Sequence, residues 1–347
     1  MTPAIFGLSG PTLTADERAF FLDSDPAGYI LFGRNVQTRE QVRALTDDLR
    51  ALHGRDRTFI CIDQEGGRVA RMKPPHWLAF PPGERFDRLY DVAPASAIEA
   101  ARANAEALGL DLAEAGISVD CLPLLDVRQP GAHDVIGDRA FGAEPMRVAA
   151  LGRATLDGLA RAGVAGVVKH IPGHGRTTTD THKSMPTVTA SEEELKTDLA
   201  PFIALRDARI AMTGHLLFTA WDKDNPATLS PFIIHEIIRK RIGFDGLLLT
   251  DDLDMEALSG TVPERAERAI AAGCDIALNC WARMDDMQEI ANRLPAVSAQ
   301  GLARLDRALE GTADFSVYAA LADQAPLVAK RDRLLALCEE GELPART

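Results

Sequence analysis

The chain lacks the segments that mark membrane and secreted proteins. No run approaches the ~18 to 20 apolar residues that a membrane-spanning helix needs. The first eight residues, MTPAIFGL, show no basic stretch followed by an apolar stretch of signal-peptide length. From these absences we expect a cytoplasmic protein that does not associate with a membrane.

The cysteines do not form a pattern that predicts disulfide bonds. There are five, an odd number, and no Cys-x-x-Cys pair occurs. Four of them lie in or beside apolar runs, which is typical of buried, reduced thiols. The sequence therefore indicates a reducing compartment.

Basic residues are too few for a nucleic-acid-binding protein. Lysine and arginine number 38 against 51 aspartates and glutamates, so the formal net charge is −13. Binding to a phosphate backbone needs a basic surface, and we therefore expect no nucleic acid as a partner. With 46% apolar and 26% charged residues, the chain has the composition of a globular protein with a large core.

Short apolar runs alternate with segments that carry apolar residues at helical spacing. The runs that read as buried strands are 4–8, 28–32, 58–62, 117–122, 166–168, 210–213, 246–250 and 275–278. The helical segments are 39–52, 95–115, 145–162, 191–206, 230–241 and 263–272. Eight such units predict an α/β protein with a (β/α)8 TIM-type barrel.

A doubly wound open sheet is the alternative fold. That fold often carries a glycine-rich phosphate fingerprint after its first strand, and residues 7–11, GLSGP, do not match it. We therefore expect one catalytic domain over residues 1–347, with the barrel at about 4–293. A helical C-terminal segment should follow at about 294–347, where no further strand pattern occurs.

Residues 169–186, KHIPGHGRTTTDTHKSMP, are the most informative stretch of the chain. They follow a strand-like run, and glycine and proline break any regular continuation, so a loop is predicted. The loop holds His170, His174, Asp180 and His182. In a barrel, reactive side chains gather at the carboxyl ends of the strands.

Polar residues follow the other predicted strands as well. They are Asp63, Glu65 and Arg71, then Asp126 and Arg139, then His215, and finally Asp251, Asp252 and Asp254. Individually, most of these acids are expected to cap helices. One such helix is expected to begin near Met255. Their grouping at one end of a barrel favours a functional site.

Three functions are compatible with these side chains. A retaining glycosidase needs a carboxylate nucleophile, for which Asp251 is a candidate, and a proton donor, for which the Asp180–His182 pair is a candidate. A metal-dependent hydrolase would use His170, His174, Asp180, His182 and His215 as ligands. A sugar-binding barrel without turnover is the third, although pure binding has little use for a titrating pair.

The motifs in these segments resemble those of family 3 glycoside hydrolases, and most closely the bacterial β-N-acetylglucosaminidases that recycle cell-wall muropeptides. The matching segments are KHIPGHG at 169–175 with the following Asp-x-His, IDQEGGRVAR at 62–71, IGDRAF at 136–141, and GFDG at 243–246 with TDDL at 250–253. The resemblance extends from about residue 4 to about residue 285.

This resemblance implies a role for each matched residue. Asp251 would be the nucleophile, His182 the general acid/base and Asp180 its partner. The N-acetylglucosamine unit would be bound by Asp63, Arg71, Arg139, Lys169 and His170. No metal and no cofactor are implied. The implied substrate is an N-acetylglucosaminyl-anhydromuramic acid, free or peptide-bearing, and the implied process is peptidoglycan recycling.

Two further expectations and one alternative complete the sequence-based account. The glycines of residues 169–186 predict a loop that closes over Asp251 during catalysis, with His174 shaping it. Asp254 adds negative charge and is expected to raise the pKa of Asp251 if both are buried. A β-glucosaminide or β-glucoside hydrolase of broader specificity, or a phosphorylase, is the alternative function.

Overall fold

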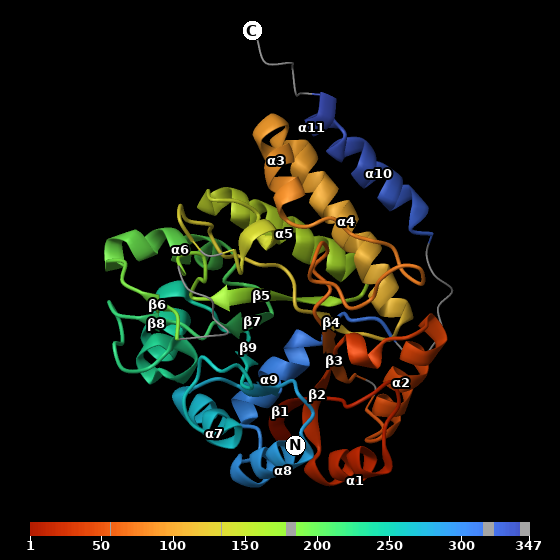
Figure 1. The fold of residues 1–347 in the computed structure, drawn as a ribbon, viewed down its shortest axis with the longest axis vertical. Helices are drawn as coiled ribbons and strands as arrows, with labels where there is room; N and C mark the ends of the chain where they lie inside the picture. The colour runs from red at the N-terminus through yellow and green to blue at the C-terminus, as the bar shows by residue number, and fades with distance from the viewer. Residues whose placement is uncertain (56, 133, 178–184, 315–322, 341–347) are drawn as a thin grey trace.

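Eight parallel strands close into a barrel, as the sequence predicts (Figure 1). The computed structural model describes residues 1–347 except 56, 133, 178–184, 315–322 and 341–347. The order around the barrel is β1-β10-β9-β7-β5-β4-β3-β2. The strands are β1 (Thr2–Gly7), β2 (Pro26–Leu31), β3 (Phe59–Ile62), β4 (Val119–Asp120), β5 (Ala165–Ile171), β7 (Ile210–Thr213), β9 (Leu247–Asp252) and β10 (Ile276–Asn279). Each coincides with one of the eight predicted runs.

The strands are apolar throughout because both of their faces are buried. In β9, Leu247 and Leu249 pack in the barrel interior, whereas Leu248 packs against the surrounding helices. The same alternation holds in β3, where Phe59 and Cys61 face inward. Side chains therefore point inward at every second residue, and this phase continues into the residues that follow each strand.

Helices cover the outside of the barrel. They are α1 (Ala15–Ser24), α2 (Arg39–Ala51), α3 (Glu84–Val92), α4 (Pro94–Glu114), α5 (Pro145–Arg161), α6 (Glu192–Ala204), the π-helix η4 (Ile233–Ile242), α7 (Val262–Ala272) and α8 (Met284–Arg293). The predicted helical segments correspond to α2, α4, α5, α6, η4 and α7, while α1, α3 and α8 were not predicted. Ser191 and Glu194 form a capping box at the start of α6.

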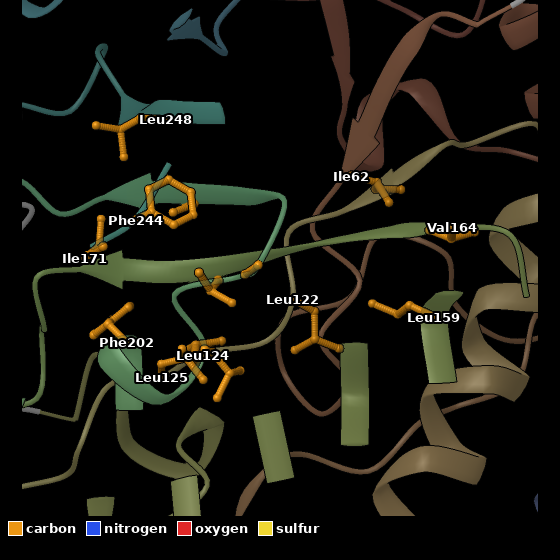
Figure 2. Close-up of a cluster of buried hydrophobic side chains, with 14 of the residues drawn as sticks. Ile62, Leu122, Leu124, Leu125, Leu159, Val164, Ile171, Phe202, Phe244 and Leu248 are labelled. Atoms are coloured by element: carbon orange, nitrogen blue, oxygen red, sulfur yellow. The ribbon is translucent and has the colours of Figure 1, made fainter. Parts of the chain in front are cut away.

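The layer between strands and helices is the larger hydrophobic core. Figure 2 shows part of it, where Ile171 and Leu248 from the strands lie near Phe202 of α6 and Phe244. Leu159 of α5 and Leu122 belong to the same cluster. This dry layer holds the strand ends in place and so fixes the positions of the side chains that follow them.

After residue 294 the described chain forms helices and no strand, as predicted, but these helices divide into two groups. Leu305 and Ala308 of α9 (Ala299–Ala308) pack with the inward-facing strand residues. Helix α10 (Ala325–Leu335) instead lies along α3 and α4, with α11 (Leu337–Glu340) beyond it (Figure 1). Helix α9 is thus part of the barrel core rather than an extension of it.

Three smaller findings concern the cysteines, the helices and a second pair of strands. All five cysteines are thiols rather than disulfides, and four are buried, which confirms the expectation. Among the described helices, none has the length and apolar composition to cross a membrane. Strands β6 (Thr187–Val188) and β8 (Leu217–Phe218) pair outside the barrel and were not predicted.

Candidate active site

The inward phase of the strands directs a group of side chains to the carboxyl end of the barrel. Asp251 is two residues after Leu249, and Asp63 is two after Cys61, so both follow residues that face the interior. Lys169 stands in the same relation to Val167 in β5. A cavity of about 270 Å³ lies here, bordered by all three of these polar residues. That volume is near the lower end of the ~300–1,000 Å³ typical of small-molecule sites.

One wall of the cavity is an ion-pair network centred on Glu65. The Lys169 Nζ lies 2.6 Å from Glu65 Oε1 and 3.2 Å from Asp63 Oδ1. Arg139 donates two hydrogen bonds of 2.7 Å to the two oxygens of Glu65. Arg71 pairs with the other oxygen of Asp63 at 3.0 Å. The structure therefore brings together four of the five predicted sugar-binding residues.

The charges in this network stabilise one another despite burial. Burial alone would raise the pKa of Glu65, but Lys169 and Arg139 lower it to about 2. Burial alone would lower the pKa of Lys169, yet Glu65 and Asp63 raise it above its ordinary value. Glu65, Lys169 and Arg139 are consequently charged at neutral pH, and the network offers fixed donors and acceptors to hydroxyl groups.

The fifth predicted sugar-binding residue, His170, is held by Asp126. The His170 Nδ1 lies 2.7 Å from Asp126 Oδ2, and the His170 backbone N–H donates to Oδ1 at 3.1 Å. The same Oδ1 accepts the His174 backbone N–H at 2.7 Å. Nδ1–H donates to the carboxylate, so Nε2 remains for a ligand in the cavity. Asp126 is therefore not a helix cap but the residue that orients His170.

His174 lies beside His170 in the wall of the cavity. The two ring centroids are 5.4 Å apart, and His174 is buried. Burial and the proximity of His170 lower the pKa of His174 to about 4, so it is neutral at physiological pH. A neutral ring packed in this way agrees with a role in shaping the base of the loop.

Asp251 lies opposite the ion-pair network. Burial would raise the pKa of this carboxyl, but His170, the Asp252 backbone N–H and Lys169 hold it below its ordinary value. The Asp252 N–H donates to Asp251 Oδ1 at 2.8 Å. The environment thus keeps Asp251 ionised, as a nucleophile requires.

His215 supports the chain around Asp251. Its pKa is lowered by burial, so the ring is neutral. Nε2 lies 2.9 Å from the Asp252 carbonyl oxygen and donates to it, because a carbonyl only accepts. Nδ1 then accepts from the Thr228 hydroxyl at 2.8 Å. Since both ring nitrogens are engaged within the protein, His215 is not available as a metal ligand.

Two expectations about the acids near Asp251 are wrong. Residues 253–258 form turns, and α7 begins only at Val262, so no helix near Met255 is capped. The Oδ2 of Asp254 instead accepts from the Asn279 side chain at 2.8 Å and from two backbone N–H groups after β10. Its charge acts on Asp252, where burial and Asp254 raise the pKa to about 7, while the pKa of Asp251 is lowered.

The predicted acid/base pair, Asp180 and His182, lies outside the described residues, as do residues 178–184 of the loop expected to close over Asp251. Among the residues that the structure does describe, no three His, Cys, Asp or Glu side chains are grouped to hold a metal ion. The predicted ligands within that part of the chain are His170, which is bound to Asp126, and the buried His174 and His215.

Glu65, Asp126 and Phe32 belong to the site, although sequence analysis assigned the first two no role beyond helix capping and did not single out Phe32. Phe32 follows β2, borders the cavity, and lies under the guanidinium of Arg71 at 5.1 Å. It is two residues after the inward-facing Ile30. The alternation of side chains in the strands is the signal that would have identified it.

Similarity to known proteins agrees with this geometry. The profile of the family described as "Glycosyl hydrolase family 3 N terminal domain" matches residues 8–310. A protein of Alkalilimnicola ehrlichii named beta-hexosaminidase is 38% identical over 80% of each chain, and one of Bordetella pertussis with the same name is 37% identical over 87% of each.

Solved structures are similar over nearly the whole chain. The crystal structure of NagZ from Neisseria gonorrhoeae in complex with N-trifluoroacetyl-D-glucosamine has a TM-score of 0.87 and 32% identity, covering 97% of this chain and 98% of that one. A structure of the same protein in complex with zinc ion has a TM-score of 0.85. With a barrel of this order, a cavity at its carboxyl end and a family match over most of its length, the chain belongs to family 3 of the glycoside hydrolases.

Proposed function

We propose that this glycoside hydrolase is a β-N-acetylhexosaminidase that releases a terminal, non-reducing β-linked N-acetylglucosamine with retention of configuration. The observation that carries the proposal is Asp251, a carboxylate kept ionised in a small cavity between two histidines and a buried ion-pair network. The relatives named beta-hexosaminidase and the Neisseria gonorrhoeae structure with an N-acylated glucosamine support the choice of sugar.

In this mechanism Asp251 attacks the anomeric carbon while the bond from that carbon to the leaving oxygen breaks. His182 gives its proton to the leaving oxygen, and Asp180 keeps the ring oriented. Water then attacks the same carbon, passes a proton to His182 and releases Asp251 as a carboxylate. The roles of His182 and Asp180 rest on the family resemblance, because both lie outside the described residues.

The ion-pair network would hold the sugar. Asp63, Arg71 and Lys169 border the cavity and present both donors and acceptors, and His170 presents Nε2. Arg139 makes two hydrogen bonds to Glu65. We therefore propose that Arg139 contributes to sugar binding chiefly by holding the carboxylate of Glu65, and with it Lys169, in place. Rigid positioning of these groups favours one sugar orientation over Asp251.

The finer parts of the proposal follow from the resemblance. We propose a cytoplasmic enzyme of peptidoglycan recycling that acts on N-acetylglucosaminyl-anhydromuramic acid, and a single catalytic domain over residues 1–347. Three alternatives remain as outcomes of the test. They are a hydrolase that also accepts β-glucosides, a phosphorylase and a metal-dependent hydrolase.

The test is turnover of an aryl N-acetylglucosaminide and the matching aryl glucoside, with the first-formed anomer followed by NMR. We expect the β-anomer first, no dependence on phosphate, no loss with a chelator, and a large preference for the acetamido sugar. Asp251→Ala should lose at least ~10³-fold in kcat, whereas Asp207→Ala, which alters an exposed aspartate, should change nothing. Near wild-type turnover by Asp251→Ala would refute the assignment of Asp251 as the nucleophile.

His182→Ala distinguishes acid catalysis from a structural role. A good leaving group needs little protonation, so we expect a large loss with a poor leaving group and a smaller loss with a good one. Equal losses would contradict the acid role. Activity removed by a chelator and restored by zinc would favour the metal-dependent alternative.

A further inference from the structure

Two arginines lie beside the ring of Phe32 in the wall of the candidate site. The guanidinium carbon of Arg71 is 5.1 Å from the ring centroid, and that of Arg34 is 4.9 Å from it. Phe32 and Arg71 both border the cavity, and Arg34 is exposed. A guanidinium within ~6 Å of a ring centroid is attracted by the π electrons of the ring. The ring therefore connects an arginine outside the cavity with one of the proposed sugar-binding residues.

Hydrogen bonds alone leave the guanidinium of Arg71 weakly fixed. Within the described part of the chain it donates one, from Nη2 to Asp63 Oδ2 at 3.0 Å, and its buried Nε has no hydrogen-bond partner. A long side chain that is held at its end by a single hydrogen bond can still pivot about that bond. The ring of Phe32 supplies a second contact, because a planar guanidinium stacks on aromatic rings.

Phe32 is itself held in place by the ends of neighbouring strands. Its backbone N–H donates to Asn35 Oδ1 at 2.8 Å, and Nδ2 of the buried Asn35 donates to the Leu8 carbonyl oxygen at 3.0 Å. Arg34 donates from Nε to the same carbonyl oxygen at 2.7 Å and from Nη2 to the carbonyl oxygen of Cys280. These hydrogen bonds join the residues that follow β1, β2 and β10, so the ring has a rigid support.

The backbone of Arg71 is fixed independently of Phe32. Its N–H donates to Gln64 Oε1 at 2.8 Å, and the same oxygen accepts from the Met72 N–H at 3.0 Å. Nε2 of the buried Gln64 donates to the Met72 carbonyl oxygen at 2.8 Å. With the backbone held in this way, loss of the Phe32 ring should free the guanidinium of Arg71 while its chain stays in place.

We propose that Phe32, supported by Arg34, is a positioning residue that holds the guanidinium of Arg71 in the orientation that binds the sugar. This inference rests on the proposed glycosidase function and adds to it a residue that prepares the binding site. Phe32 acts through Arg71 rather than on the reacting atoms. A group that is fixed before binding loses less freedom when the substrate arrives, so Phe32 strengthens binding more than it speeds the chemical step.

The experiment is a double-mutant cycle on the turnover of an aryl N-acetylglucosaminide. For Phe32→Leu, which keeps an apolar side chain but removes the ring, we expect KM to rise roughly 5- to 10-fold with kcat within about twofold. In an Arg71→Ala background the same substitution should change kcat/KM by less than about twofold, because the group that it positions is absent. Phe20→Leu, which alters a partly buried phenylalanine of α1 that packs on Phe6, is the matched control and should change neither constant.

A second variant tests the inference if Phe32→Leu does not fold. Arg71→Lys keeps a positive charge for Asp63 but has no planar group to stack on the ring. We expect KM to rise at least ~5-fold for this variant. A KM equal to that of the wild type would overturn the inference.

The outcomes separate this inference from the proposed function. Equal effects of Phe32→Leu with and without the Arg71 side chain would show that the ring does not act through Arg71, and would overturn the positioning role. A loss confined to kcat, or no loss at all, would overturn it as well. Failure of the wild-type enzyme to cleave the aryl N-acetylglucosaminide would instead refute the proposed function itself.

Discussion

The buried carboxylate of Glu65 allows the strongest quantitative prediction about this protein. Its side chain is 4% exposed, pairs with Lys169, and accepts hydrogen bonds from Nε and Nη2 of Arg139. Glu65→Gln keeps the size of the side chain but removes the charge that compensates two buried cations. Among the described residues, the ion-pair partner that Lys169 would then retain is Asp63, at 3.2 Å.

Two independent arguments give the size of the effect. Breaking a buried ion pair by removing one partner costs ~3–5 kcal/mol of folding free energy. The pKa of Glu65, about 2 in the folded protein, lies some two units below the ~4.3 of an unfolded chain, which is worth roughly 3 kcal/mol at neutral pH. We therefore expect Glu65→Gln to lower the free energy of unfolding by about 3 kcal/mol at pH 7.

The stabilisation by Glu65 should change with pH in a direction that can be checked. Because the pKa of Glu65 is depressed in the folded protein, the stabilisation that its carboxylate provides is fully present above pH ~5. It is lost as the pH falls toward ~2. The difference between wild type and Glu65→Gln should shrink to about half by pH 3.

The assay is urea unfolding of both proteins across this pH range. Glu193→Gln, which alters a 79% exposed glutamate paired with Lys196, is the matched control and should change stability by less than ~0.5 kcal/mol. A Glu65→Gln protein within ~1 kcal/mol of wild type at pH 7, or a difference that grows toward low pH, would refute the reasoning.

Three further predictions concern the residues around the cavity. Asp126→Asn removes the charged acceptor of the His170 hydrogen bond. We therefore expect kcat/KM to fall ~10- to 100-fold with good and poor leaving groups alike. A loss confined to poor leaving groups would contradict this. The pKa of Asp252 is raised to about 7, so its carboxyl destabilises the fold as the pH rises from about 4 through 7. Asp252→Asn should therefore gain on the order of 2 kcal/mol in urea unfolding at pH 8 and little at pH 4, and equal gains would refute the assignment. A Cβ at Gly175 would lie 1.9 Å from the Val127 carbonyl oxygen. Gly175→Ala should therefore lower the thermal unfolding midpoint by several degrees or prevent folding. An unchanged midpoint would contradict the close approach of these two segments.

The barrel was predictable because its strands are short apolar runs bounded by turns, a pattern that packing on both faces imposes. Helices α1, α3 and α8 were missed, the first two for local reasons. Phe20, Phe21 and Leu22 in α1 are consecutive rather than spaced along one face. Helix α3 has only nine residues, too few for a periodic pattern to stand out. The strands therefore carried more of the fold information than the helices.

The location of the site was predictable from the sequence, but the pairs of side chains that interact within it were not. Residues that follow strands meet at one end of a barrel, which placed Asp63, Lys169 and Asp251 together. The pairing of Glu65 with Arg139 joins residues 74 positions apart, and only the closed barrel brings them into contact. For the same reason the roles of Asp126 and Asp254 were mistaken for helix caps.

The central claim is that Asp251 forms a covalent bond to the sugar. Incubation with 5-fluoro-N-acetylglucosaminyl fluoride should trap the glycosyl-enzyme, because the added fluorine slows the second step of a retaining mechanism. Peptide mass spectrometry should then locate one sugar adduct on Asp251 and none in Asp251→Ala. An adduct on another residue, or the α-anomer as the first product of a β-substrate with no adduct at all, would contradict the account.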